Sequence, residues 1–256
     1  MRMIGSLAFP VLLLSAFSMF AEQEITIAAA ADLQPVMQEL ATRFESQTHS
    51  KVRLSFGSSG NFFAQIQNGA PYDLFFSADV SYPQKLQDAG LTQPGSLYEY
   101  ATGKIVLWVP KTSVIDVSKG LSVVADPAVK RLAIANPAHA PYGRAAQAAL
   151  RKAGLWEKVA PKVVMGENIA QTAEFVESGN ADVGILALSL ALSPSMRNEG
   201  RYFEIPQQLY PPLRQAVVIL KRARHKEVAE RLVEFVRTPA TKSLLLQYGF
   251  APPENP

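Results

Sequence analysis

The segment Ser55–Asp79 (SFGSSGNFFAQIQNGAPYDLFFSAD) constrains the fold most, because it passes from a strand through a glycine- and serine-rich turn into a helix. We predict a helix that begins at about Asn61 with Ser59 as its N-cap. Residues 73–77 then read as a short buried strand, which closes a βαβ unit. A glycine-rich turn at a helix N-terminus lets the backbone approach an anion closely. The segment therefore predicts an α/β fold that is able to bind an anion at one edge of its sheet.

Three further turns lead from a predicted strand into a predicted helix. The strand 24–30 enters a helix at Asp32 or Leu33, for which Asp32 is the expected N-cap. Strand 131–135 precedes a helix over 144–153, and strand 163–165 precedes one over 169–178. Each helix N-terminus carries roughly half a positive charge, so four of them directed at one point would suit a dianion. The alternative is that these are ordinary α/β turns that point to separate places.

Two strong predicted strands divide the chain. Strand 104–110 leaves the first sheet, and strand 215–220 returns to it after a second strand–helix series that ends with a buried strand at 182–187. We therefore predict one discontinuous lobe over 22–103 plus 215–256 and a second lobe over 104–214. Closing helices are expected at 226–238 and 240–248.

The first residues are typical of a secretory signal peptide, which we place at 1–21. Arg2 precedes an apolar run from Ile4 to Phe20, and small residues follow before Glu22. No other segment is long and apolar enough to span a bilayer. The chain has no cysteine, which excludes disulfides, thiolate metal sites and a lipidated N-terminal cysteine. These features predict a soluble protein of a Gram-negative periplasm.

Composition argues against several classes of function. The formal charge of +3 is small and dispersed, so nucleic acid is not an expected partner. The three histidines are scattered and no motif for a metal or cofactor is present, so we expect neither. A serine hydrolase built from Ser59, His139 and Asp73 or Asp79 is the alternative from another class. The turn lacks the G-x-S-x-G spacing, and we expect the chain not to be an enzyme.

Several motifs resemble those of a known family. They are Ile25–Leu33 (ITIAAAADL), Ser55–Gly60 (SFGSSG), Gln65–Ile66, Gly69–Pro71 (GAP), Asp73–Asp79 (DLFFSAD), Asn136–Ala146 (NPAHAPYGRAA), Glu167–Ile169 (ENI) and Tyr248–Phe250 (YGF). In order and spacing the chain resembles the periplasmic molybdate-binding proteins of ABC transporters, over essentially the whole mature chain. This resemblance implies a type II periplasmic binding protein, with two α/β lobes and an oxyanion bound in the cleft between them.

The resemblance also assigns the binding positions. Asp32 falls at the first position, Ser59 at the second, Tyr142 at the third and Ile169 at the fourth. Backbone N–H groups would be the donors, with the Ser59 hydroxyl added. At the fifth position some members have a tyrosine, where this chain has Ala187. We hypothesise that the Tyr142 phenol replaces that missing hydroxyl from the other side of the cleft.

Two neighbouring side chains need separate consideration. The Asp32 carboxylate would repel a dianion, so we predict that it turns away from the ligand to cap its own helix. A role as a cap alone is the alternative for this residue. Ser58, next to Ser59, is a further candidate for the site.

The implied function is capture and delivery. The lobes would close about strands near 104–110 and 214–220 on molybdate or tungstate, and the closed form would then dock on a membrane permease. We expect no direct protein ligand to molybdenum. We also expect the protein to be a monomer. The alternative ligands are sulfate, another oxyanion or a small organic acid. A carboxylate ligand usually calls for a buried arginine, for which Arg144 and Arg214 are the candidates.

Overall fold

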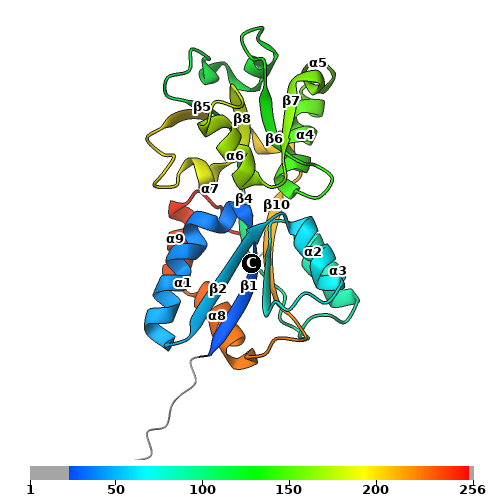
Figure 1. Ribbon diagram of the computed structural model, residues 1–256, viewed down its shortest axis with the longest axis vertical. Coiled ribbons are helices and arrows are strands. Elements are labelled where there is room, and N and C mark those ends of the chain that lie inside the picture. Colours follow the sequence, from blue (N-terminus) through cyan, green and yellow to red (C-terminus); the bar gives the residue numbers. More distant parts are fainter. Residues whose placement is uncertain (1–22, 254–256) are drawn as a thin grey trace, which may run out of the picture.

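Two mixed β-sheets, each with five strands, lie at the centre of residues 23–253, the part of the chain that the computed structural model describes (Figure 1). The first sheet has the order β2 (Lys51–Gly57), β1 (Glu24–Ala30), β3 (Leu74–Ser77), β10 (Leu213–Ile219) and β4 (Tyr98–Gly103). The second has the order β7 (Val163–Gly166), β6 (Leu132–Ala135), β8 (Val183–Ala187), β5 (Ile105–Pro110) and β9 (Gly200–Glu204). The predicted signal peptide lies outside the described residues.

The two sheets have the same internal arrangement. Strand β1 runs parallel to β2 and β3, as β6 does to β7 and β8. Strand β10 is antiparallel to β3 and β4, and β5 is antiparallel to β8 and β9. Because β5 follows β4 and β10 follows β9, the chain crosses between the sheets at 103–105 and 204–213. We propose that each sheet is the centre of one lobe, with the boundaries predicted from the sequence.

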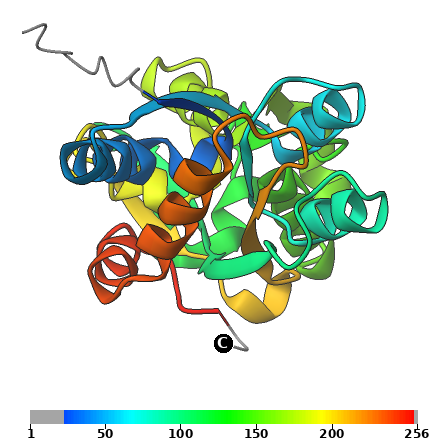
Figure 2. The ribbon, with the colours of Figure 1, turned by 90° about the horizontal axis from the view of Figure 1, so that it is seen from below.

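Helices cover both faces of the first sheet (Figure 2). One face packs against α1 (Gln34–Thr48), α8 (Lys226–Arg237) and α9 (Pro239–Gln247), and the other against α2 (Ser59–Gln67) and α3 (Ser81–Asp88). Helix α8 shows why these helices pack against the sheet: its apolar residues Val228, Leu232 and Val236 recur at helical spacing and are buried. Each such side chain contributes about 1.5–3 kcal/mol by leaving water.

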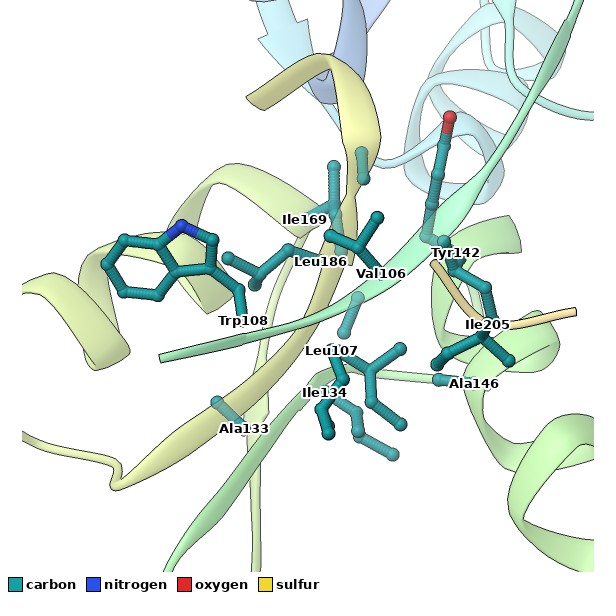
Figure 3. Packing of buried hydrophobic residues seen from close by; sticks show 14 of the residues in the cluster. Val106, Leu107, Trp108, Ala133, Ile134, Tyr142, Ala146, Ile169, Leu186 and Ile205 are labelled. Atoms are coloured by element: carbon teal, nitrogen blue, oxygen red, sulfur yellow. The ribbon is translucent and has the colours of Figure 1, made fainter. Parts of the chain in front are cut away.

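The core of the second lobe lies around β5, β6 and β8 (Figure 3). Its helices are α4 (Pro141–Lys152), α5 (Trp156–Val159), α6 (Ile169–Glu177) and α7 (Leu188–Ala191). Short 3₁₀ segments are η1 (Ala31–Leu33), η2 (Val117–Ala125), η3 (Ala160–Lys162) and η4 (Gln207–Leu209). Trp108 and Leu107 of β5 are buried in this core. Within residues 23–253, no helix has the length and apolar character needed to cross a membrane.

Two predicted helix caps are wrong. Asp32 does not cap a helix: it lies inside η1, and its carboxylate makes no cap hydrogen bond there. Helix α2 begins at Ser59 rather than Asn61, and its N-cap is Ser58, whose Oγ accepts a hydrogen bond from the Asn61 N–H. A start two residues earlier places Ser59 in the first turn, where its own N–H has no carbonyl partner within the helix.

Helix α4 also begins earlier than predicted, at Pro141 instead of Arg144. Proline is favoured at the first helical position because its missing N–H would have no partner there. The strands β4 and β9 were not predicted at all. Both lie at the edge of their sheets, and β9 is largely exposed, so neither shows a continuous apolar run.

Candidate functional site

A small cavity lies where the carboxyl ends of the parallel strands of both sheets meet. Its volume is about 10 Å³, which is about the space that one water molecule occupies. The lining residues come from both lobes: Ala30, Ala31, Asp32, Gly57, Ser58, Ser59, Ala78, Ala140, Pro141, Tyr142 and Ile169. Ligands of open α/β sheets collect at this strand edge, so the location fits a binding site.

The structure brings four of the predicted site residues to this cavity. Ser59 and Ile169 are the first residues of α2 and α6, Tyr142 is the second residue of α4, and Asp32 lies in η1. All four are buried, with relative exposures between 0% and 4%. First-turn amides of a helix have no carbonyl partner within it, and the helix dipole adds positive potential there. The arrangement offers neutral donors to an anion.

The caps of α2 and α6 determine which of these donors stay available. Asn168 Oδ1 accepts from the amides of Ala170 and Gln171, which leaves the Ile169 amide outside the cap. The Ser59 Oγ accepts from the Ala78 N–H at 3.0 Å, so its own proton remains to be donated. Ser59 can therefore present both its N–H and its hydroxyl to a ligand.

The Asp32 side chain reaches across to other elements instead of capping its helix. Its Oδ2 accepts hydrogen bonds from the Tyr142 hydroxyl at 2.9 Å and from the Gln215 amide. Burial raises the pKa of this carboxyl to about 6, against the lowering effect of the hydrogen bonds from Gln215 and Tyr142 and of the nearby backbone N–H of Asp32 itself. The carboxyl is thus a buried acid that titrates close to neutrality.

The Tyr142 phenol bridges the two lobes. Its oxygen extends away from the core of the second lobe toward the first (Figure 3), where it donates to Asp32 and accepts from Gln215 Nε2 at 3.2 Å. Burial and the Asp32 charge raise the pKa of this phenol well above its usual value. Because its proton is donated to Asp32 here, the hypothesis that the phenol replaces a ligand hydroxyl stays a prediction.

The two further candidates have other positions. Ala187, the last residue of β8, is not one of the cavity-lining residues. Ser58 lines the cavity, but its Oγ caps α2 and lies 2.8 Å from Nδ1 of His139 in the second lobe. Ser58 therefore connects the lobes.

Other contacts also hold the lobes together around the cavity. The Gly60 N–H donates to the His139 carbonyl at 2.9 Å. Arg144 of α4 donates to Asp79 Oδ2 at 2.7 Å and to the Tyr82 hydroxyl at 3.1 Å. The two lobes are thus in direct contact in this structure.

The alternative hydrolase arrangement of Ser59, His139 and Asp73 or Asp79 does not form. His139 contacts Ser58 rather than Ser59, and Asp79 pairs with Arg144. Glu167 Oε2 lies 3.4 Å from His139 Nε2, which gives a serine–histidine–carboxylate row, but the Glu167 side chain is 67% exposed. An exposed carboxylate does not hold an imidazole in one orientation as a buried triad carboxylate does.

Sequence reasoning missed the residues that hold Asp32 in place. Gln215 and Ser189 are buried, Tyr100 donates to Gln215 Oε1 at 2.8 Å, and the Ser189 Oγ donates to the Asp32 carbonyl at 2.7 Å. A glutamine inside the apolar strand QAVVIL was the one available signal, since a buried polar side chain needs a partner. Ser189 and Tyr100 gave none.

The cavity is unlike the other sites that the described residues offer. No group of three or more histidine or acidic side chains could hold a metal ion within residues 23–253. A larger hollow of about 610 Å³ lies near Tyr98, Leu246 and Phe250, but it is mostly apolar. Helix N-termini converge on the small cavity, which makes it the candidate anion site.

Comparison with known proteins agrees with this geometry. Residues 25–251 match the model of the family described as bacterial extracellular solute-binding protein. The chain belongs to this family. Its resemblance to the molybdate-binding proteins is confirmed: it is 41% identical to molybdate-binding protein ModA of Azotobacter vinelandii over 89% of each chain. It is 37% identical to the ModA of Rhodobacter capsulatus, over 89% of this chain and 88% of that protein.

A solved structure supports the fold of this family member. The periplasmic molybdate-binding protein of Azotobacter vinelandii superposes with a TM-score of 0.85 at 34% identity, covering 90% of this chain and all of that one. The predicted type II periplasmic binding protein fold is therefore confirmed. These relatives are binding proteins, which confirms the expectation that the chain is not an enzyme.

Proposed function

We propose that this solute-binding protein captures molybdate between its lobes and delivers it to the permease of an ABC transporter. The observation that carries the proposal is the convergence of Asp32, Ser59, Tyr142 and Ile169 on one cavity between the lobes. First-turn amides and one serine hydroxyl form a set of neutral donors for a tetrahedral dianion. Relatives named molybdate-binding protein, at 41% and 37% identity, support this choice of ligand. Tungstate, which has the same charge and geometry, is proposed as a second ligand.

Lobe movement is part of this proposal. The cavity is lined by buried residues of both lobes, so the lobes must separate to admit an anion and close again around it. Contacts between the lobes, such as Gly60 with His139 and Arg144 with Asp79, re-form as they close. The closed form is the one that we expect to dock on the permease, and we expect the binding protein to be a monomer.

A carboxylate ligand is less well supported by the site. Arg144 pairs with Asp79 and Arg214 with Glu99, and neither arginine lines the cavity. Sulfate remains the alternative, because it has the same shape and charge as molybdate and differs in size. The size of the pocket must therefore discriminate between sulfate and molybdate.

The proposed location is the periplasm, reached through the signal peptide 1–21. The family is extracellular, which supports export. The mass of the exported protein tests this: removal of about twenty residues is expected, and an intact N-terminus would contradict it.

Thermal unfolding of the mature protein with molybdate, tungstate, sulfate or phosphate tests the ligand. An anion at about a thousand times its dissociation constant adds roughly 4 kcal/mol of stability, which raises the midpoint by about ten degrees at this size. We expect such shifts with molybdate and tungstate and none with sulfate or phosphate. A shift with sulfate alone would reassign the ligand, and no shift with any of them would reject an oxyanion site.

A further inference from the structure

The Asp32 carboxyl has one oxygen that the protein does not satisfy. Asp32 lines the cavity and is 0% exposed. Its Oδ2 takes hydrogen bonds from Tyr142 and Gln215, whereas Oδ1 has no hydrogen-bond partner among the described residues. A buried polar atom without a partner is uncommon and calls for an explanation. Two donors on Oδ2 fix the plane of the carboxyl, and therefore fix where Oδ1 lies.

The groups that face Asp32 from the surrounding elements are all neutral donors or neutral phenols. Tyr142 comes from α4, Gln215 from β10, Tyr100 from β4 through Gln215, and Ser189 from α7. The start of α2 contributes Ser58 and Ser59, and the start of α6 contributes Ile169. No lysine or arginine contacts the carboxyl within the described residues.

The charged side chains of the elements packed against Asp32 lie at the surface. Ion pairs among them join Arg43 with Glu39, Arg53 with Glu24, Arg144 with Asp79 and Arg214 with Glu99. The remaining charged groups on α1, β2 and α6 are Glu45, Lys51, Glu174 and Glu177. A negative charge on Asp32 is therefore offset only by hydrogen bonds.

Because Asp32 lines the cavity and only its Oδ1 lacks a partner, Oδ1 is the carboxyl oxygen left to face an oxyanion bound there. If the carboxyl were ionised, two oxygens that only accept hydrogen bonds would face each other, both negatively charged and both away from water. One proton between them removes the repulsion and makes a short charge-assisted hydrogen bond. Burial already favours the neutral form of this carboxyl before any anion arrives.

We propose that the site takes up its oxyanion together with one proton, which lies between Oδ1 of Asp32 and an oxygen of the ligand. This proposal rests on the proposed function and adds a determinant of specificity to it. Solvent supplies the proton, no covalent bond other than O–H changes, and the bound complex carries two negative charges instead of three. Because molybdate and tungstate oxygens are more basic than those of sulfate, a carboxylic acid donor favours the first two. Asp32 thus acts through its side chain as well as its backbone.

Isothermal titration of the mature protein with sodium molybdate tests the proposal. At each pH from 5 to 8.5 the titration is repeated in two buffers of different ionisation enthalpy, which gives the number of protons taken up. We expect uptake close to one proton at pH 8, falling toward zero below about pH 6, where free Asp32 is already protonated. The dissociation constant should rise about tenfold per pH unit above that range.

The variant Asp32→Asn tests whether the proton taken up is the one on this carboxyl. Its amide keeps the shape and can donate to the ligand without titrating, so we expect tight binding with no proton uptake and no pH dependence. Asp88→Asn removes a carboxylate from the exposed end of α3 and should behave like the unmodified protein. Tight molybdate binding by the unmodified protein with zero proton uptake between pH 7 and 8.5 would overturn the proposal alone. No binding of molybdate at any pH would overturn the proposed function, and this proposal with it.

Discussion

Gly60 offers a way to oppose closure of the lobes without touching the ligand. A Cβ added there would lie 2.5 Å from the His139 carbonyl oxygen and 2.9 Å from the His139 Cα, both backbone atoms of the other lobe. Real Cβ contacts stay above 3.0 Å, so Gly60→Ala must hold the two backbones at least about half an ångström further apart. The nearest side-chain atom of its own lobe is the Tyr82 hydroxyl, at 2.8 Å, and that side chain can rotate.

The cost of this separation follows from the contacts that it breaks. The Gly60 N–H to His139 carbonyl bond and the Ser58 to His139 bond both depend on the close approach. At about 0.5–1.5 kcal/mol for each hydrogen bond, their loss weakens closure by about 1–3 kcal/mol. The dissociation constant for molybdate should therefore rise between about fivefold and 150-fold.

Isothermal titration with molybdate measures this effect, and Asn61→Ala is the matched control. Asn61 is exposed in the same turn of α2, so its replacement should leave the affinity unchanged. Without ligand, Gly60→Ala should unfold at the same temperature as the unmodified protein or slightly above it, because alanine favours a helix more than glycine does. An affinity for molybdate within twofold of the unmodified protein would refute the reasoning that this contact belongs to the closed state.

Three further predictions concern the groups around the cavity. Tyr142→Phe removes the hydroxyl that joins the lobes through Asp32, so molybdate affinity should fall at least about tenfold by titration, and unchanged affinity would reject that link. Asp32→Asn should stabilise the ligand-free protein by up to about 3 kcal/mol in denaturant unfolding at pH 7, because the folded state raises the pKa of this acid from 3.8 to about 6. The folded state binds the proton more tightly than the unfolded state does, so the gain in unfolding free energy should be absent below pH 3.8 and should grow up to about pH 6. A gain that does not change with pH would contradict this prediction. Arg144→Gln should speed release of molybdate severalfold in stopped-flow measurements by breaking a half-exposed ion pair with Asp79, with a smaller effect at high salt, and an unchanged release rate would argue against a role in closure.

Local sequence patterns predicted the parts of the fold that depend on local chemistry. The apolar spacing of α8 and the buried runs of β5 and β10 place these elements within two residues of their observed bounds. The edge strands β4 and β9 escaped prediction, because they lack a continuous apolar run. Helix caps were the weakest point: Ser58 and Ser59 are chemically equivalent in the sequence, and only packing decides which one caps α2.

The site shows the same division between local and distant information. Ser59 and Ile169 could be placed near helix starts from their own neighbourhoods. The helix of Tyr142 was expected only from Arg144, so its place at a helix start came from the resemblance to the family. The partners of Asp32 could not, because Tyr142 lies 110 residues away along the chain and Gln215 lies 183 away. The expected cap at Asp32 was wrong for this reason: distant donors provided a better partner than the helix itself.

A crystal structure of the mature protein with molybdate would show directly where the anion binds. We expect one tetrahedral anion between the lobes, with its oxygens within hydrogen-bond distance, about 2.7–3.2 Å, of the amides of Asp32, Ser59, Tyr142 and Ile169. The Ser59 hydroxyl should complete the set of neutral donors. An anion bound elsewhere, or held mainly by arginine or lysine side chains, would contradict it.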